Sequence, residues 1–269
     1  MRAHGLGCIP RLAVPGCAHT TDPRSLPGAY RRATRGLRAL RGADLAVSYS
    51  SAVDRHLALN GVARRRVVPL FATVAPALGA GYEGRRRVVF AGRIVAPKGI
   101  GVLIRAAAAL DAELVICGDG WRLSQMRALA QELGVRQRVS FKGWLDSAEL
   151  ARELADASVV AVPSVWPEPF GLVGIEAFAA GRPVVASSTG GIGDWLEHGV
   201  NGLAVAPGDA HALARALGEL LDDPARQQAM GEAGQRMAAE RFSPGRHVAA
   251  LSEAYRSARA RWESGARPA

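Results

Sequence analysis

Long apolar runs, which would place a chain in or across a membrane, are missing from this sequence of 269 residues. No stretch reaches the roughly 18 consecutive apolar residues that a membrane-spanning helix requires. The first residues, MRAHGLGCIPRLAVPG, lack the continuous apolar core of a signal peptide. The cytoplasm is therefore the expected compartment.

Cysteine is also scarce, and the three cysteines do not form a recognisable metal or disulfide pattern. Cys117 lies in the strand-like run LVICG, where we expect a small core residue. Cys8 and Cys17 could meet in space, but one pair at this spacing is weak evidence for a disulfide or a zinc site. Two free thiols are the favoured interpretation, and we expect no metal site.

Lysine and aromatic residues are few, although the net charge is +10. The lysines are Lys98 and Lys142 alone, and the many arginines lie along the whole chain. Aromatic residues make up 6% and do not alternate with basic ones as in proteins that stack single strands. Nucleic acid is therefore not an expected partner.

What the chain does contain is an alternation of short apolar strands and longer amphipathic helices from residue 87 onward. Strands are expected at RVVFAG, ELVICG, VSFKG, ASVVAVPS, RPVVAS and GLAVAP. Helices are expected at about residues 99–110, 121–133, 146–155, 170–180 and 209–221, and from 224 onward. Strands that alternate with helices predict an α/β fold with a doubly wound parallel sheet.

The part before residue 87 is too small for a second α/β domain of ordinary size. It predicts a helix at 29–40, a strand in ADLAVSYSS, a helix at 51–59 and a short strand in RRVVPL. We interpret residues 1–78 as the last elements of an N-terminal domain whose beginning is absent. Residues 79–86, which include Gly79, Gly81 and Gly84, are the expected linker.

The segment GRIVAPKG follows the first strand of the regular domain and carries two cations, Arg93 and Lys98. In open α/β sheets, ligands bind beyond the carboxyl ends of the strands. A guanidinium and an ammonium can bind a diphosphate there and offset the charge of a departing nucleoside diphosphate. Two solvated surface charges are the alternative.

A second segment, EPFGLVGIE, holds two carboxylates eight residues apart, Glu168 and Glu176, around Gly171. Both can face one crevice and accept hydrogen bonds from sugar hydroxyls. Ordinary surface acids are the alternative, but Glu176 lies in an apolar stretch where an unpaired charge is costly.

The segment SSTGGIGDW is the third candidate for ligand contact. Gly190 and Gly191 allow main-chain amides to approach a ligand, whereas Asp194 is either a ligand partner or a turn-stabilising residue.

The strings GRIVAPKG, FKGWL, EPFGLVGIE with AAGRPVVAS, and TGGI…HGVNGLAV resemble, in order and spacing, family 4 glycosyltransferases of the GT-B superfamily. The resemblance covers about residues 85–242. It implies a complete C-terminal Rossmann-like domain at 87–242, a partial N-terminal Rossmann-like domain, and a helix at 243–269 that packs back towards the latter.

The resemblance also implies a retaining transfer of a sugar from a nucleoside-diphosphate sugar to a glycan, lipid or other cell-envelope acceptor, with no cofactor or metal. Arg93, Lys98 and Glu168 would be the catalytic residues: the two cations hold the diphosphate, and Glu168 binds the transferred sugar. Glu176 would bind the ribose. The remaining donor-binding residues would be Gly92, Phe170, Gly171, Leu172, Gly190 and Gly191, with Lys142, Gly143 and Trp144 bordering the base.

The sequence departs from the family at Asp194, where the family usually has Glu, and in its first domain. The glycine-rich loop and the histidine of that domain have no convincing counterpart, since neither His4 nor His19 is a good candidate. A nucleotide-sugar-binding module without complete catalytic machinery is therefore the main alternative.

A dehydrogenase is disfavoured because CGDGWRL has Leu123 where the dinucleotide-binding fingerprint needs glycine. An epimerase or phosphorylase is disfavoured by the two-glutamate segment.

Arg31, Arg35 and Arg38 lie on one face of the helix expected at 29–40. A basic face of this kind could contact anionic lipid at the inner face of the plasma membrane, where a lipid-linked acceptor would lie. A solvated helix face is the alternative.

Overall fold

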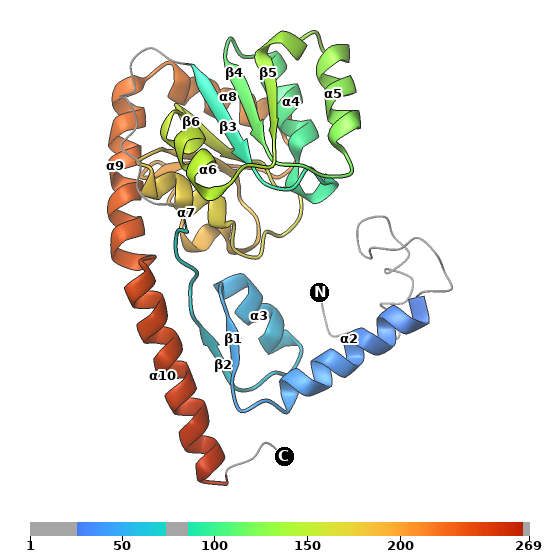
Figure 1. Cartoon of the computed structure of the whole chain (residues 1–269), viewed down its shortest axis with the longest axis vertical. Helices are drawn as coiled ribbons and strands as arrows, with labels where there is room; N and C mark the ends of the chain where they lie inside the picture. Colours follow the sequence, from blue (N-terminus) through green and yellow to red (C-terminus); the bar gives the residue numbers. More distant parts are fainter. Residues whose placement is uncertain (1–25, 74–85, 266–269) are drawn as a thin grey trace. The chain divides into compact units, whose positions relative to one another are not determined.

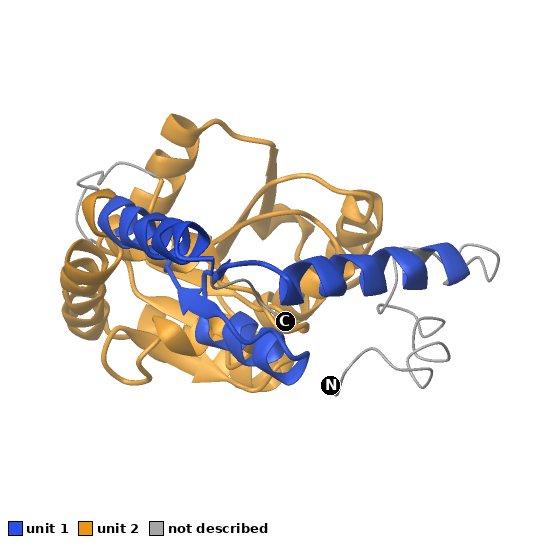
Figure 2. Ribbon diagram, turned by 90° about the horizontal axis from the view of Figure 1, so that it is seen from below, with its two compact units in different colours: residues 1–69, 247–269 blue, residues 70–246 orange. Residues whose placement is uncertain are grey.

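The computed structural model describes residues 26–73 and 86–265, which belong to two compact units. Unit 1 consists of residues 1–69 and 247–269, and unit 2 of residues 70–246 (Figure 2). Most of the expected linker, together with Cys8, Cys17, His4 and His19, lies outside the described residues.

Unit 2 is built on a six-stranded sheet in which every neighbouring pair of strands is parallel (Figure 1). The strand order is β5-β4-β3-β6-β7-β8, so the chain moves outward from β3 to β5 and then returns to the other side of β3. The doubly wound sheet predicted from the sequence is confirmed. The strands are β3 (Arg87–Ala91), β4 (Glu113–Cys117), β5 (Val139–Gly143), β6 (Val159–Val162), β7 (Val184–Ser187) and β8 (Gly202–Val205).

Helices connect these strands at the expected places, and their first residues explain where several of them begin. Asp146 and Glu149 form a reciprocal capping box at the start of α6. Asp209 accepts a hydrogen bond from the amide of Ala212 at the start of α8, and Pro224 opens α9. The helices are α4 (Ile100–Ala108), α5 (Leu123–Glu132), α6 (Ser147–Ala155), α7 (Leu172–Ala179), α8 (Ala210–Leu221) and α9 (Pro224–Arg241); short 3₁₀ turns occur at η3 (Ala96–Lys98), η4 (Arg136–Arg138) and η5 (Gly190–Asp194).

The sheet of unit 2 is buried on both faces, as its nearly continuous apolar strands require. Along β3, Val88 and Phe90 pack into a cluster that α4, α5 and α8 complete, whereas Val89 points into the opposite cluster. The opposite cluster is completed by α6, α7 and α9 and includes the fully buried Trp195. Cys117 belongs to this cluster, so its expected role as a core residue is confirmed.

Unit 1 contains α2 (Leu26–Arg41), β1 (Ala46–Ser48), α3 (Ser51–Leu59) and β2 (Arg65–Val67), and α10 (Pro244–Glu263) belongs to it from His247 onward. The two strands are parallel. Near the start of α10, Nδ1 of His247 lies 2.7 Å from the carbonyl oxygen of Pro69. None of the helices within residues 26–73 and 86–265 combines the length and the hydropathy needed to cross a bilayer.

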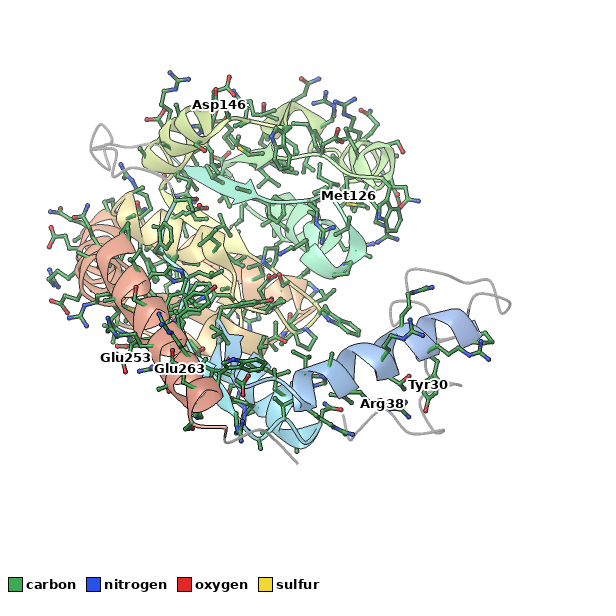
Figure 3. The ribbon with its side chains drawn as sticks, turned by 60° about the horizontal axis from the view of Figure 1, so that its bottom comes forward. Tyr30, Arg38, Met126, Asp146, Glu253 and Glu263 are labelled. Atoms are coloured by element: carbon green, nitrogen blue, oxygen red, sulfur yellow. The ribbon has the colours of Figure 1, made fainter. Side chains whose placement is uncertain are left out.

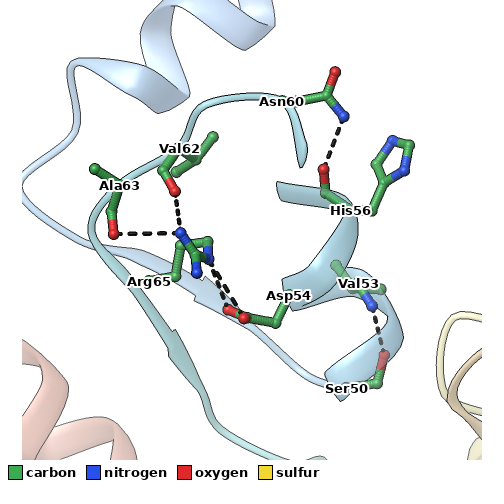
Figure 4. Close-up of polar contacts among 8 residues, drawn as sticks. All are labelled: Ser50, Val53, Asp54, His56, Asn60, Val62, Ala63 and Arg65. Carbon is green, nitrogen blue, oxygen red and sulfur yellow. Dashed lines mark hydrogen bonds and ion pairs between the residues drawn. The ribbon is translucent and has the colours of Figure 1, made fainter. Parts of the chain in front are cut away.

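Local polar contacts stabilise the β1-α3-β2 part of unit 1 (Figure 4). Ser50 caps α3 by accepting a hydrogen bond of 3.2 Å from the amide of Val53. Arg65 forms an ion pair of 3.3 Å with Asp54 and donates to the carbonyl oxygen of Val62. The ion pair thus joins the first turn of α3 to the first residue of β2.

One close approach in unit 2 can be tested by substitution. A Cβ added to Gly174 in α7 would lie 2.2 Å from the ring of Trp195. We expect Gly174→Ala to lower the free energy of unfolding by about 1–3 kcal/mol, because the added methyl overpacks the core. Gly218→Ala in α8 is the control, since its Cβ would meet its nearest neighbour, Leu110, at an ordinary 3.5 Å. Urea unfolding should show the control unchanged or more stable by up to about 1 kcal/mol; equal effects of both changes would contradict this packing.

Candidate functional site

The candidate site lies where the winding of the sheet reverses, between β3 and β6. In open parallel sheets this point leaves a crevice at the carboxyl ends of the strands, where ligands bind. The loop after β3 carries Lys98, and the loop after β6 carries Glu168. The two loops are joined by a hydrogen bond of 2.9 Å from the amide of Val165 to the carbonyl oxygen of Pro97.

Lys98 and Glu168 are in direct contact across this reversal point. Nζ of Lys98 donates to both carboxylate oxygens of Glu168, at 2.9 and 2.8 Å. The hydroxyl of Ser164 donates to Oε2 of the same carboxylate at 2.7 Å. The side chain of Glu168 is only 9% exposed, whereas that of Lys98 is 28% exposed. The structure therefore offers a fixed carboxylate beside an ammonium that solvent, or a ligand, can still reach.

Close packing of the two loops brings Lys98 to this position. Gly99, the next residue, has φ +70°, and a Cβ there would lie 1.8 Å from the carbonyl oxygen of Pro163. Only glycine can adopt this conformation at this separation. The sequence shows the glycine of GRIVAPKG but not the strand end against which it packs.

The predicted glycine pair Gly190 and Gly191 lies against the main chain of Glu168. The amide of Gly191 donates to the carbonyl oxygen of Glu168 at 2.7 Å. Gly190 has φ +63°, and a Cβ there would lie 2.1 Å from that same oxygen. The amide of Gly191 thus holds the main chain of Glu168, while the carboxylate stays available to Lys98 and Ser164.

Trp195 is a supporting residue that the sequence analysis did not single out. Its indole nitrogen donates to the carbonyl oxygen of Phe170 at 2.6 Å, which fixes the loop between Glu168 and α7. Its ring meets the ring of Phe178 edge-on, with 5.6 Å between the centroids. A tryptophan within a stretch of small and polar residues was the one available signal for this role.

Glu176, the second carboxylate, lies in the middle of α7 and is buried. Burial raises the pKa of its carboxyl, and hydrogen bonds from the side chain and the backbone of Thr73 act in the opposite direction. Phe170 and Gly171 are buried at the start of α7, and Leu172 is partly buried there. The predicted ligand contacts of these residues stay predictions.

The other predicted residues take no part in the hydrogen bonds that join Lys98, Ser164 and Glu168. Arg93 is exposed in the loop that Gly92 begins, and it makes no ion pair with any residue of 26–73 or 86–265. Trp144 is 77% exposed after β5, where the carbonyl oxygen of Gly143 accepts a hydrogen bond of 2.7 Å from the amide of Gly118.

Lys142 forms an ion pair of 3.3 Å with Glu153 of α6, which also binds Arg87 at the start of β3. Its ammonium therefore belongs to a charged cluster on the α6 face of the sheet. Cys117 lies near this cluster, and burial raises the pKa of its thiol to about 12, so the thiol stays protonated at neutral pH.

Comparison with known proteins decides the family of the chain. The sequence profile described as "Glycosyl transferases group 1" matches residues 79–237, more than half of the chain. The chain belongs to the glycosyl transferases group 1 family. The contact of Lys98 with Glu168 and the segment of α7 both lie within the matched residues 79–237.

Curated relatives match with moderate identity. An uncharacterized glycosyltransferase of Methanocaldococcus jannaschii is 39% identical over 145 residues, which cover 52% of the chain and 37% of the relative. A D-inositol 3-phosphate glycosyltransferase of Catenulispora acidiphila is 32% identical along an alignment that covers 95% of the chain and 65% of the relative. The chain thus spans about a third to two thirds of the length of these relatives.

Solved structures of GT-B glycosyltransferases share the fold. HepE of Anabaena, solved with UDP and glucose, superposes with a TM-score of 0.78 and 25% identity, covering 88% of this chain and 69% of that one. The sucrose-phosphate synthase of Thermosynechococcus elongatus superposes with a TM-score of 0.79 and 28% identity, covering 96% and 67%. The expected GT-B type of α/β fold is confirmed.

Ser164 provides a test of how the buried carboxylate is held. We expect Ser164→Ala to lower the free energy of unfolding by about 1–3 kcal/mol, because Glu168 loses a buried hydrogen-bond donor. Ser188→Ala is the control, since Ser188 is exposed in the loop after β7 and its change should stay within about 0.5 kcal/mol. Chemical denaturation of both variants measures the difference, and a Ser164→Ala protein as stable as its control would argue against this hydrogen bond.

Proposed function

We propose that the glycosyltransferase moves a hexose from a nucleoside-diphosphate sugar to a glycan, lipid or other cell-envelope acceptor, with retention of anomeric configuration. The observation that carries this proposal is the contact of Lys98 with the buried carboxylate of Glu168 at the reversal point of the sheet. Membership of the family and the UDP in the HepE structure support a nucleotide sugar as the donor.

In this proposal the two cations act on the diphosphate. The partly exposed ammonium of Lys98 and the exposed guanidinium of Arg93 bind the phosphates and stabilise the charge that develops as the nucleoside diphosphate leaves. Because these residues supply positive charge at the leaving group, the reaction needs no metal ion or other cofactor.

Glu168 acts on the transferred sugar. A carboxylate has about four lone-pair sites, and Lys98 and Ser164 occupy three of them. The remaining acceptor site can accept a hydrogen bond from a sugar hydroxyl. The ammonium of Lys98 has three N–H donors and can also donate to the phosphate. The same pair thereby aligns the sugar with its leaving group.

A second candidate function is a nucleotide-sugar-binding module that acts together with a partner chain. The two functions differ in turnover, since a module binds the donor without transferring the sugar.

The donor site can be tested with nucleotides alone. We expect UDP, GDP, ADP or dTDP to raise the melting temperature of the chain in a thermal-shift screen, because a ligand that binds only the folded state stabilises it.

Lys98→Ala and Glu168→Ala should each abolish sugar transfer from the matching donor while the variants keep native circular dichroism.

The control for these variants is Arg105→Ala, which removes an exposed cation of α4. It should keep both the thermal shift and the transfer of the native chain. Native transfer rates in either Lys98→Ala or Glu168→Ala would refute the site, and a thermal shift without turnover in the native chain would favour the binding module.

We also propose that the enzyme works in the cytoplasm against the inner face of the plasma membrane. In α2, Arg31, Arg35 and Arg38 are exposed, and the helix has no acidic residue in its first turn and two arginines in its last. Figure 3 labels Arg38 and Tyr30 on this helix. A helix of this pattern is suited to an anionic lipid surface.

Charge reversal tests the membrane contact. A triple variant in which Arg31, Arg35 and Arg38 are changed to Glu should no longer cosediment with vesicles of phosphatidylglycerol and phosphatidylcholine. Each basic residue contributes about 1 kcal/mol to binding near such a surface. The same reversal at Arg105, Arg127 and Arg152, which are exposed in unit 2, controls for net charge. Equal loss in both triple variants, or native binding in the first, would remove α2 as the contact.

A further inference from the structure

The chain that enters unit 2 runs directly to the buried carboxylate of Glu176. Leu70 and Ala72 pack on the apolar cluster of α6, α7 and α9. Thr73 follows them, and its hydroxyl donates a hydrogen bond to Oε1 of Glu176, 103 residues away in the sequence. The backbone of Thr73 also forms a hydrogen bond with this carboxylate.

Glu176 has unusual surroundings for a carboxylate. It is 6% exposed, and it is the one charged residue in a helix otherwise made of apolar residues and glycine. Among the described residues, the pKa of its carboxyl responds only to burial and to Thr73; no charged side chain of α6 or α9, which pack on α7, contributes. Thr73 is thus the group that compensates for the buried carboxylate.

We propose that Thr73 is a positioning residue that holds Glu176 in place for the vicinal hydroxyls of a nucleoside ribose. The proposal rests on the proposed function. Glu176 is the predicted ribose partner, whereas Thr73 comes from a segment outside the matched family motifs. The two hydrogen bonds from Thr73 use about half of the acceptor capacity of the carboxylate and leave room for two donors from a ligand.

The neutrality of Thr73 matters to this role. A lysine or arginine at this position would form an ion pair with Glu176 and compete with a ligand for its charge. A hydroxyl and a backbone amide orient the carboxylate but leave its negative charge for the ligand hydroxyls. Glu168, in contrast, already faces the ammonium of Lys98.

A direct test follows the carboxyl of Glu176 without any ligand. The protein is labelled with carbon-13 at its glutamates, and the titration of the Glu176 carboxyl is followed by NMR in the native protein, in Thr73→Val and in Thr73→Ser. The signal of Glu176 is assigned as the one that disappears in Glu176→Gln. Valine keeps the shape of threonine but lacks the hydroxyl, so we expect the titration of Glu176 to move to higher pH. Serine restores the hydroxyl and should restore the native titration; an unmoved titration in Thr73→Val would overturn the proposal.

A binding test decides whether this hydrogen bond serves the nucleotide. Isothermal calorimetry uses whichever of UDP, GDP, ADP and dTDP stabilises the native chain most. Thr73→Val should raise its Kd about tenfold or more, and Thr73→Ser should stay close to native, because hydrogen bonds to charged groups are among the stronger ones. Thr73→Val with a native Kd would overturn the role of Thr73 and leave the proposed function intact.

The two tests separate the two proposals. If none of the four nucleotides binds the native chain, the proposed function fails and with it the ribose as ligand. A melting temperature of Thr73→Val near that of the native chain shows that the variant is folded, so that a weaker Kd reports on the site itself.

Discussion

A buried carboxylate without partners is costly, and the site of this protein is organised around the way in which Glu168 avoids that cost. Its carboxylate receives hydrogen bonds from Lys98 and Ser164, and its main chain is held by Gly191. These partners come from the loops after β3, β6 and β7, so the contact exists only if three neighbouring strands of the sheet are in register. The loops are close enough because glycines stand where any side chain would collide with the neighbouring backbone.

The sheet supplies the rigid frame for these loops. Its strands alternate residues between two apolar clusters, each completed by its own helices. Because both faces are covered, the polar groups of the site lie beyond the carboxyl ends of the strands. The reversal between β3 and β6 then separates two connections that leave in opposite directions, and the site of Lys98 and Glu168 forms between them.

The two carboxylates of the segment EPFGLVGIE have different surroundings, which suits them to different tasks. Glu168 faces an ammonium, so its charge is balanced and its orientation is fixed. Glu176 faces a neutral hydroxyl within an apolar helix, and burial raises the pKa of its carboxyl. In the proposed function, Glu176 binds the hydroxyls of the ribose, whereas Glu168 binds the transferred sugar beside the phosphate that Lys98 holds.

Features that depend on neighbouring residues could be predicted from the sequence. The strands and the helices expected at 146–155, 209–221 and 51–59 all appear in the structure, because periodicity and capping act over a few residues. The family and the doubly wound sheet were also predictable, since the motifs lie in order along the chain. Whether the proposed ligands bind at Arg93, Lys142 or Trp144 stays a prediction.

The choice of partners was decided by the tertiary structure. Nothing in the sequence pairs Lys142 with Glu153, joins the indole of Trp195 to the carbonyl oxygen of Phe170, or brings Thr73 to Glu176. Lys98 and Lys142 each have many acids within reach of a flexible chain, and the packed sheet brings Glu168 to the first and Glu153 to the second. The sequence by itself determined the elements and the residue types at the site, and the long-range packing decided which of those residues meet.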